Sequence, residues 1–293
     1  MNLKSYLAAR AAEVDHALDA FLPKAKERPL TIHAAMRYSV FSGGKRLRPV
    51  LCLAAAEACG GDPSEALAPA CAVELMHTYS LVHDDLPAMD DDDLRRGRPT
   101  CHKVYGEGMA VLCGDALLTE SFAVLAHTVP TQRYSTRDYL AEFASTGGST
   151  KLIGGQVMDL EGEGKKLTLR DLVRIHEAKT AALLTTALRL GAMTANATPA
   201  KLKALTDFGH ALGLAFQVID DILDVTQTTE VLGKTAGKDA AVEKATYPAI
   251  LGLDAARKEA ATLTTRAMSS LKPLGKKAAR LEEIAAHLLQ REY

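Results

Sequence analysis

The chain has 293 residues, 47% of them hydrophobic, and its 35 Lys and Arg nearly balance its 36 Asp and Glu, so the net charge is −1. This balance gives no reason to expect nucleic acid or an acidic membrane surface as a partner. The five cysteines form no C-x-x-C pair, which predicts reduced thiols in a cytoplasmic protein and argues against a zinc site.

Apolar residues recur at helical spacing along most of the chain, while β-branched runs are few and Trp is absent. The first of these stretches contains acidic residues that the core of a secretory signal would not tolerate. No apolar run approaches the length of a membrane span. We therefore predict one soluble, all-α domain over residues 1–293, with helices over 3–22, 51–59, 66–82, 109–125, 171–193, 201–225 and 281–289.

Two local signals refine this pattern. Thr168, followed three residues later by Asp171, predicts a helix N-cap and an acid in the first turn. The glycine pairs at 147–148 and 154–155 lie close to helical pattern, which predicts close approach of another backbone or a ligand.

Three basic segments place cations where phosphate groups would need them. Arg binds phosphate through a bidentate fork, and Lys acts as a point charge. The segment GKTAGKD lacks the spacing of a P-loop and no strand precedes it, so ATP binding is excluded. The cations are Lys45, Arg46 and Arg48 beside a glycine pair, then Arg95, Arg96 and Arg98, then Lys234 and Lys238.

The first acidic cluster, HDDLPAMDDDD at residues 83–93, follows a predicted helix. On a regular helix Asp90 lies about 120° from Asp84, and Asp91 would align better. The intervening proline disfavours a regular helix, so spacing leaves Asp90, Asp91 and Asp92 open as partners of Asp84. A calcium loop is the weaker alternative, because the EF-hand ligand alternation, its glycine and its terminal glutamate are absent.

His77 lies two helical turns before Asp84 on the same face. A lone histidine on a buried helix is more often a core residue than a ligand. Its alignment with the acidic cluster nevertheless makes it a candidate site residue.

The second acidic cluster, FQVIDDILD at residues 216–224, also places carboxylates within an apolar helical stretch. Asp220 and Asp224 share one helix face, Gln217 lies close to that face, and Asp221 points elsewhere. The surrounding apolar residues leave no wide polar face, which argues against a solvated acidic stripe. Clustered carboxylates repel one another, and Mg²⁺ relieves that repulsion while accepting substrate phosphate as a further ligand. The two clusters therefore predict a cavity that holds a phosphorylated substrate through metal.

Taken together, these segments resemble the short-chain trans-isoprenyl diphosphate synthases, and most closely the bacterial farnesyl diphosphate synthases. The resemblance runs from GGKRLRP at 43–49 through GGQVMDL at 154–160 and HEAKTAAL at 176–183 to KATYP at 244–248, and includes both acidic clusters. It implies a bundle of roughly antiparallel helices around a deep central cavity, usually in a homodimer. The implied reaction joins isopentenyl diphosphate to an allylic diphosphate.

The resemblance also implies roles for individual residues. Three Mg²⁺ ions would be held by Asp84, Asp90 and Asp220, with Asp224 assisting. The allylic diphosphate would be held by Arg95, Lys179 and Lys234, and isopentenyl diphosphate by Lys45, Arg48, His77 and Arg96. The carbocation formed on ionisation would be lined by Thr180 and Gln217.

Product length depends on the wall below Asp84. In the resembling family a bulky aromatic five residues before the first aspartate acts as a floor for a fifteen-carbon product. Tyr79 occupies that position, which favours farnesyl diphosphate over geranylgeranyl or geranyl diphosphate. The alternative is that Tyr79 only fills space between helices.

Two other functions compete with this one. A class I terpene cyclase also ionises an allylic diphosphate, but it typically pairs one aspartate-rich motif with an Asn/Ser/Glu triad, whereas both clusters here are aspartate-rich. A non-catalytic subunit that tunes a partner synthase would not need intact ligands in both clusters.

Overall fold

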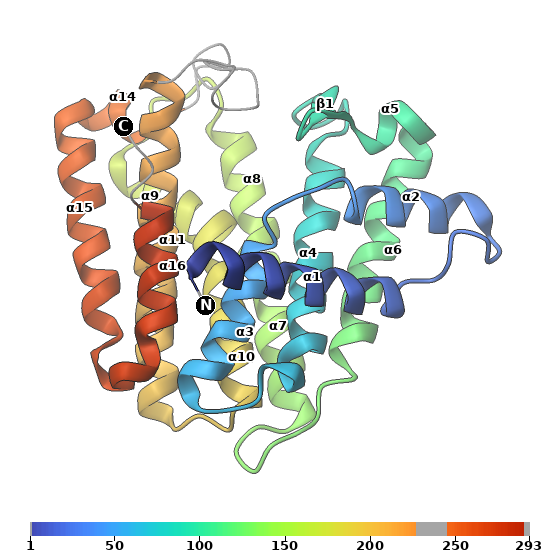
Figure 1. Ribbon diagram of the computed structural model, residues 1–293. Coiled ribbons are helices and arrows are strands. Elements are labelled where there is room, and N and C mark those ends of the chain that lie inside the picture. The colour runs from blue at the N-terminus through green and yellow to red at the C-terminus, as the bar shows by residue number, and fades with distance from the viewer. Residues whose placement is uncertain (1, 227–244, 290–293) are drawn as a thin grey trace.

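The structure is a computed structural model that describes residues 2–226 and 245–289 (Figure 1). It is an all-α bundle of roughly antiparallel helices, as predicted. The helices are α1 (Leu3–Phe21), α2 (Leu30–Val40), α3 (Leu47–Cys59), α4 (Leu67–Asp84), α5 (Cys101–Tyr105), α6 (Glu107–Leu125), α7 (Thr136–Gly147), α8 (Leu152–Gly162), α9 (Leu169–His176), α10 (Ala182–Thr194), α11 (Pro199–Thr226), α14 (Tyr247–Leu251), α15 (Leu253–Ser270) and α16 (Ala279–Leu289).

The remaining elements are short. A hairpin of β1 (Leu94–Arg95) and β2 (Arg98–Pro99) follows α4, and 3₁₀ turns cover Pro63–Ala66 and Lys272–Ala278. A π-helical segment, Glu177–Ala181, joins α9 to α10. The predicted helix over 171–193 is therefore one continuous path with a π-helical interruption.

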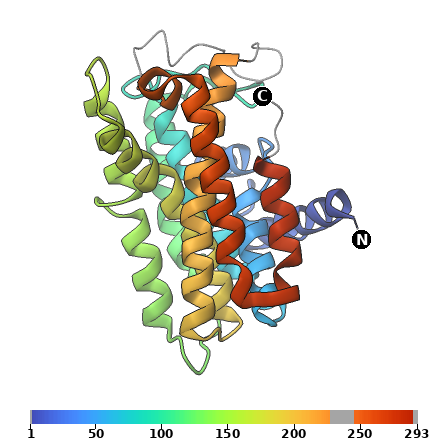
Figure 2. The same cartoon turned by 90° about the vertical axis from the view of Figure 1, so that its left-hand side faces the viewer.

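The long helices run side by side, and α1 lies across them (Figures 1 and 2). Their apolar side chains form two buried clusters. One is centred on α11, α15 and α16, the other on α4, α6 and α2, and both α3 and α10 contribute side chains to each. The helices α4 and α11, which carry the two acidic clusters, therefore belong to different parts of the core, and their upper ends stand apart.

The predicted start of α9 is confirmed. The Thr168 side chain accepts a hydrogen bond from the Asp171 backbone N–H, and the Asp171 carboxylate accepts one from the Thr168 backbone N–H at 3.1 Å. This reciprocal capping box satisfies donors that a helix N-terminus otherwise leaves unpaired. It fixes the point from which the chain enters the π-helical segment.

One sequence-based expectation needs correction. Among the described residues, α6 has the length and the apolar composition to cross a membrane, with a mean hydropathy of 1.5. The expectation that no apolar run approaches that length applies to uninterrupted runs, since Glu107, Asp115 and Glu120 divide this helix, but the many Ala, Val and Leu residues still raise its mean hydropathy to that of a possible span. The helices α4 and α2 pack along α6. A helix inside a bundle passes the same test of length and composition.

Candidate active site

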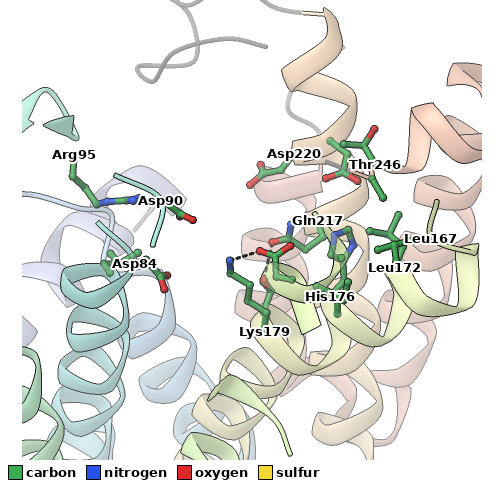
Figure 3. A pocket seen from close by; sticks show the side chains of 17 residues that line it. Asp84, Asp90, Arg95, Leu167, Leu172, His176, Lys179, Gln217, Asp220 and Thr246 are labelled. Atoms are coloured by element: carbon green, nitrogen blue, oxygen red, sulfur yellow. Dashed lines mark hydrogen bonds and ion pairs between the residues drawn. The ribbon is translucent and has the colours of Figure 1, made fainter. Parts of the chain in front are cut away.

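The two acidic clusters line one cavity of about 350 Å³. One wall carries Asp84 and Asp90, with Arg95 from the hairpin, and the other carries Gln217 and Asp220 from α11. Figure 3 shows the carboxylates of the two walls pointing into the space between them. Lys179 and Thr180 of the π-helical segment also line this cavity, which we call the acidic cavity.

The turn after α4 selects among the aspartates of the first cluster. The helix ends at Asp84, and the Asp90 backbone N–H donates to the Asp84 carbonyl at 2.8 Å, so the chain folds back on itself. Asp90 lines the acidic cavity beside Asp84, whereas Asp91 and Asp92 are not among its lining residues. The choice that spacing left open thus falls on Asp90.

The Asp84 carboxyl sits in a setting that disfavours its charge. Burial, followed by repulsion from Asp90 and Asp85, raises its pKa to about 6, although Lys179 and Arg95 act in the opposite direction. Asp85 is engaged elsewhere, since it accepts a hydrogen bond from Arg95 Nε at 2.7 Å. A bound cation would reverse the penalty on Asp84, and oxygen donors of this kind suit Mg²⁺. The donor set therefore fits the predicted metal.

The second cluster divides its aspartates between site and scaffold. Asp220 lines the acidic cavity. Asp221 also lines this cavity, contrary to the prediction that it points elsewhere, and it accepts a hydrogen bond from the Tyr247 backbone N–H at 2.9 Å, which ties α11 to α14. Asp224 is buried and is not among the residues that line the acidic cavity. The predicted helper role of Asp224 thus gains no support from its position.

A compact group of possible metal ligands lies outside the predicted set. Among the described residues, ligand atoms of Asp91, Asp93 and His102 lie within 4.8 Å of one another. Asp93 is already paired with Lys103 Nζ at 2.7 Å, and both carboxylates are exposed. Asp91 is one of the partners that spacing left open for Asp84, whereas Asp93 and His102 were not predicted as ligands.

The π-helical segment presents two adjacent polar side chains to the acidic cavity. Lys179 Nζ lies 2.6 Å from Asp159 Oδ2 of α8, and Thr180 Oγ1 donates to Gln217 Oε1 at 2.8 Å. Such segments are rare and often occur at functional sites. The sequence reasoning missed Asp159, although a lone acid in the otherwise apolar GGQVMDL was a usable signal.

The glycine pair of α8 allows this arrangement. A Cβ on Gly155 would lie 2.7 Å from Lys179 Cα, closer than real Cβ atoms come to other atoms. The predicted close approach is therefore, at Gly155, a contact with the backbone that carries Lys179, whereas Gly154 faces the backbone of Ser149.

A second cavity of about 410 Å³ adjoins the acidic cavity and shares Leu81, Asp84, Lys179 and Thr180 with it. We call it the apolar cavity. It extends along α4 past Ser80 to Tyr79 and is otherwise walled mainly by aliphatic side chains: Leu152, Ile153, Val157, Leu160 and Leu183.

Two of the predicted phosphate-binding residues meet at one side of the apolar cavity. Arg48 Nη1 lies 3.2 Å from His77 Nε2, and because a guanidinium can only donate, the imidazole nitrogen accepts. Burial, then the charge of Arg48, then that of Arg96 lower the pKa of His77. This histidine is therefore neutral, with a ring nitrogen that orients Arg48.

The glycine-rich loop lies against the hairpin. Arg96 donates to the Gly43 carbonyl, and a Cβ on Gly44 would lie 2.7 Å from Arg96 Cζ. The position of Arg46 in the motif suggested a phosphate ligand. In the structure Arg46 is buried and pairs with Glu74 at 2.9 Å, so it holds the loop in place instead. Lys45 is exposed and lines neither cavity.

The predicted residues thus lie in different places, and Lys45 and Asp224 line neither cavity. The acidic cavity brings together Asp84, Asp90, Arg95, Lys179, Thr180, Gln217 and Asp220. Arg48 and His77 line the adjoining apolar cavity, and Arg96 lies beside the loop. Lys234 lies outside the described residues.

Comparison with known proteins agrees with this arrangement. The sequence model of the polyprenyl synthetase family matches residues 29–286. The chain is 47% identical to the chloroplastic geranylgeranyl pyrophosphate synthase of Capsicum annuum, over 99% of this chain and 79% of the relative. Two solved structures are similar over nearly their whole length. The FPP/GFPP synthase of Zymomonas mobilis has a TM-score of 0.85 and 34% identity, with 98% and 99% of the two chains covered. The geranyltransferase of Legionella pneumophila has a TM-score of 0.87 and 31% identity, with 99% and 98% covered.

Proposed function

Because the chain belongs to the polyprenyl synthetase family and is a short-chain prenyl diphosphate synthase, we propose that it makes farnesyl diphosphate. The substrates would be isopentenyl diphosphate and, in two successive rounds, dimethylallyl and geranyl diphosphate. Pyrophosphate would leave in each round.

The observation that carries this proposal is the pair of carboxylate walls in the acidic cavity. Asp84 and Asp90 face Asp220 across a space that also receives Lys179 and Arg95. A diphosphate between the walls would be held directly by the two cations. Bound Mg²⁺ would supply positive charge that stabilises the leaving pyrophosphate. Asp84, Asp90 and Asp220 would hold the ions, of which three are expected.

Ionisation leaves an allylic carbocation next to Thr180 and Gln217. Thr180 donates its hydroxyl hydrogen to Gln217 Oε1, so the lone pairs on its own oxygen remain available to face positive charge. Thr180 lines both cavities, whereas Gln217 lines the acidic one. Fixed dipoles aimed at developing charge are an effective means of stabilising a transition state.

Arg48, His77 and Arg96 would hold isopentenyl diphosphate without metal. Arg48, His77 and Thr180 all line the apolar cavity, which supports a position for isopentenyl diphosphate with its double bond near the carbocation. Attack of that double bond on the cation forms the new carbon–carbon bond, and loss of a proton completes the product. The departing pyrophosphate is our proposed proton acceptor, because it is a base that is released next to the carbocation.

Tyr79 supports a fifteen-carbon product. It is only 5% exposed and lines the apolar cavity on the α4 wall, below Asp84. A ring in that position would stop the growing chain. The curated relatives are named as geranylgeranyl pyrophosphate synthases, so a twenty-carbon product is the alternative.

One assay tests the whole proposal. The purified chain is given isopentenyl diphosphate with each allylic starter, and pyrophosphate release and product length are measured. Release with a fifteen-carbon product supports it. Tyr79→Ala should then lengthen the product, and unchanged length would remove the argument from Tyr79. A terpene cyclase would convert farnesyl diphosphate alone into a hydrocarbon. This chain should give none.

Three further expectations remain predictions: a single domain over residues 1–293, a cytoplasmic location, and a homodimer. The exposed Val111 and Leu112 on α6 give the homodimer some support, because an apolar face of this kind suits contact with a second copy. Light scattering of the purified chain would test it.

A further inference from the structure

We propose that His83 is a specificity-determining residue that holds Tyr79 in place as the floor of the apolar cavity, and that Gly114 provides the space that allows it. This inference rests on the proposed function, because it concerns the length of the prenyl product. It adds a second layer of residues to the length control expected from Tyr79 alone.

His83 and Tyr79 are four residues apart on α4 and therefore lie on the same side of the helix, one turn apart. Their ring centroids are 5.9 Å apart at an interplanar angle of 86°, an edge-to-face arrangement. Both residues line the apolar cavity. Aromatic pairs of this geometry attract each other beyond their buried area. The imidazole therefore restricts where the Tyr79 ring can turn.

The imidazole is itself fixed from α6. His83 Nε2 lies 3.0 Å from the Val111 carbonyl oxygen, and because a carbonyl can only accept, Nε2 carries the hydrogen. This bond sets both the tautomer and the ring plane. Asp115 Oδ1 lies farther away, at 3.9 Å.

Gly114 makes room for this ring. A Cβ on Gly114 would lie 2.7 Å from His83 Cε1 and closer still to two other ring atoms. The imidazole thus occupies a notch on α6 that exists because residue 114 has no side chain. Any side chain there would push the imidazole away from α6, toward Tyr79 and the cavity.

Two substitutions should consequently change product length in opposite directions. His83→Ala leaves space beside the Tyr79 ring, into which the ring can turn away from the cavity. The ratio of twenty-carbon to fifteen-carbon product should rise roughly tenfold. A small change in the barrier to a further elongation, relative to the barrier to release of the fifteen-carbon product, is enough for this. Gly114→Ala should instead narrow the cavity and raise the ratio of ten-carbon to fifteen-carbon product.

The double variant His83→Ala/Gly114→Ala distinguishes this contact from general damage. Without an imidazole, the added methyl group has nothing to displace, so the double variant should give the product ratio of His83→Ala alone. Cys113→Ala is the matched control, since it removes a buried neighbouring group on α6 that contacts Ser39 rather than His83. It should leave the product ratio unchanged.

The experiment measures product length by chromatography, together with total isopentenyl incorporation, for the wild-type chain and these variants. Opposite shifts that do not add in the double variant support the inference. Unchanged ratios in both single variants overturn it, as does a loss of rate without any change in ratio. If His83→Ala fails to fold, Gly114→Ala decides alone, by shortening the product or not. Absence of any incorporation by the wild-type chain would instead refute the proposed function.

Discussion

Asp84 and Asp220 lie on opposite walls of one cavity, one at the end of α4 and the other within α11 (Figure 3). Neither helix could hold a diphosphate through metal by itself, because each offers carboxylates from a single side. Because both residues line one cavity, a single ligand there could be held from two directions, as we propose.

Replacing either carboxylate should therefore abolish most activity. We expect Asp84→Asn and Asp220→Asn each to lower turnover by roughly a hundredfold to a thousandfold. Each change removes stabilisation of the charge that develops on the leaving pyrophosphate in the transition state. Pyrophosphate release at saturating Mg²⁺ measures this. Asp207→Asn is the matched control, since Asp207 is on α11 but pairs with Lys203 at the surface. Near-normal turnover of Asp220→Asn would contradict a shared diphosphate site.

The raised pKa of Asp84, about 6, predicts a specific pH dependence. Mg²⁺ must displace the proton below this pH, so the half-saturating Mg²⁺ concentration should rise by up to about tenfold for each pH unit below 6. For the metal-free protein, the same protonation should stabilise the folded state. Its folded state binds this proton more tightly than the unfolded state, so the Asp84 contribution to stability is largest at low pH and is lost as pH rises through 6.

Titrating activity with Mg²⁺ at several pH values, and unfolding the metal-free protein with urea over the same range, checks both signs. In the Asp84→Asn variant the stability change between pH 5 and 7 should shrink. A Mg²⁺ requirement independent of pH below 6 would show that the pKa of Asp84 does not control metal binding.

The sequence predicted the long helices well, because their apolar spacing extends over several turns and dominates weaker signals. Among the longer helices it missed α2 and α8, which span only 11 residues each, and α7 and α15, in which charged and polar residues dilute the pattern. It also extended one helix through the π-helical segment. That segment packs against the backbone of Gly155 in a different helix. No local pattern contains this contact.

The site residues also divide into those set by local spacing and those set by contacts between distant segments. Asp84, Asp220 and Gln217 could be predicted because they interrupt apolar helices at helical spacing. The choice of Asp90 over Asp91 depended on how the chain turns after α4. Arg46 and Arg48 looked alike in the sequence, but only the fold places Glu74 beside Arg46 and so makes it structural.

Asp159 should act by positioning Lys179. The carboxylate is nearly buried and lies 2.6 Å from Lys179 Nζ. Asp159→Asn keeps the shape but removes the charge, so we expect kcat/KM for the allylic diphosphate to fall roughly tenfold, as for other groups that orient a ligand-binding side chain. Steady-state kinetics with varied allylic substrate measures this change.

The same change in a Lys179→Ala background tests the cause. If Asp159 works through Lys179, the double variant should lose no more activity than Lys179→Ala alone. Additive losses would mean that Asp159 has a separate role.

Gly155 makes the sharpest test of the π-helical segment, because its neighbour is backbone and cannot easily move. A methyl group there would press on Lys179 Cα, so Gly155→Ala should lower the free energy of unfolding by about 1–3 kcal/mol. Activity should fall further than stability explains, since a shift of about 1 Å in Lys179 and Thr180 would lower turnover roughly a hundredfold.

Gly108→Ala is the control, because nothing lies within 4 Å of its added Cβ and Gly108 is in a helix. That control should be neutral or stabilise the chain by up to about 1 kcal/mol. Urea unfolding and turnover of the two variants, measured side by side, would separate the effects, and equal behaviour of both would show that the contact between α8 and the π-helical segment does not shape the site.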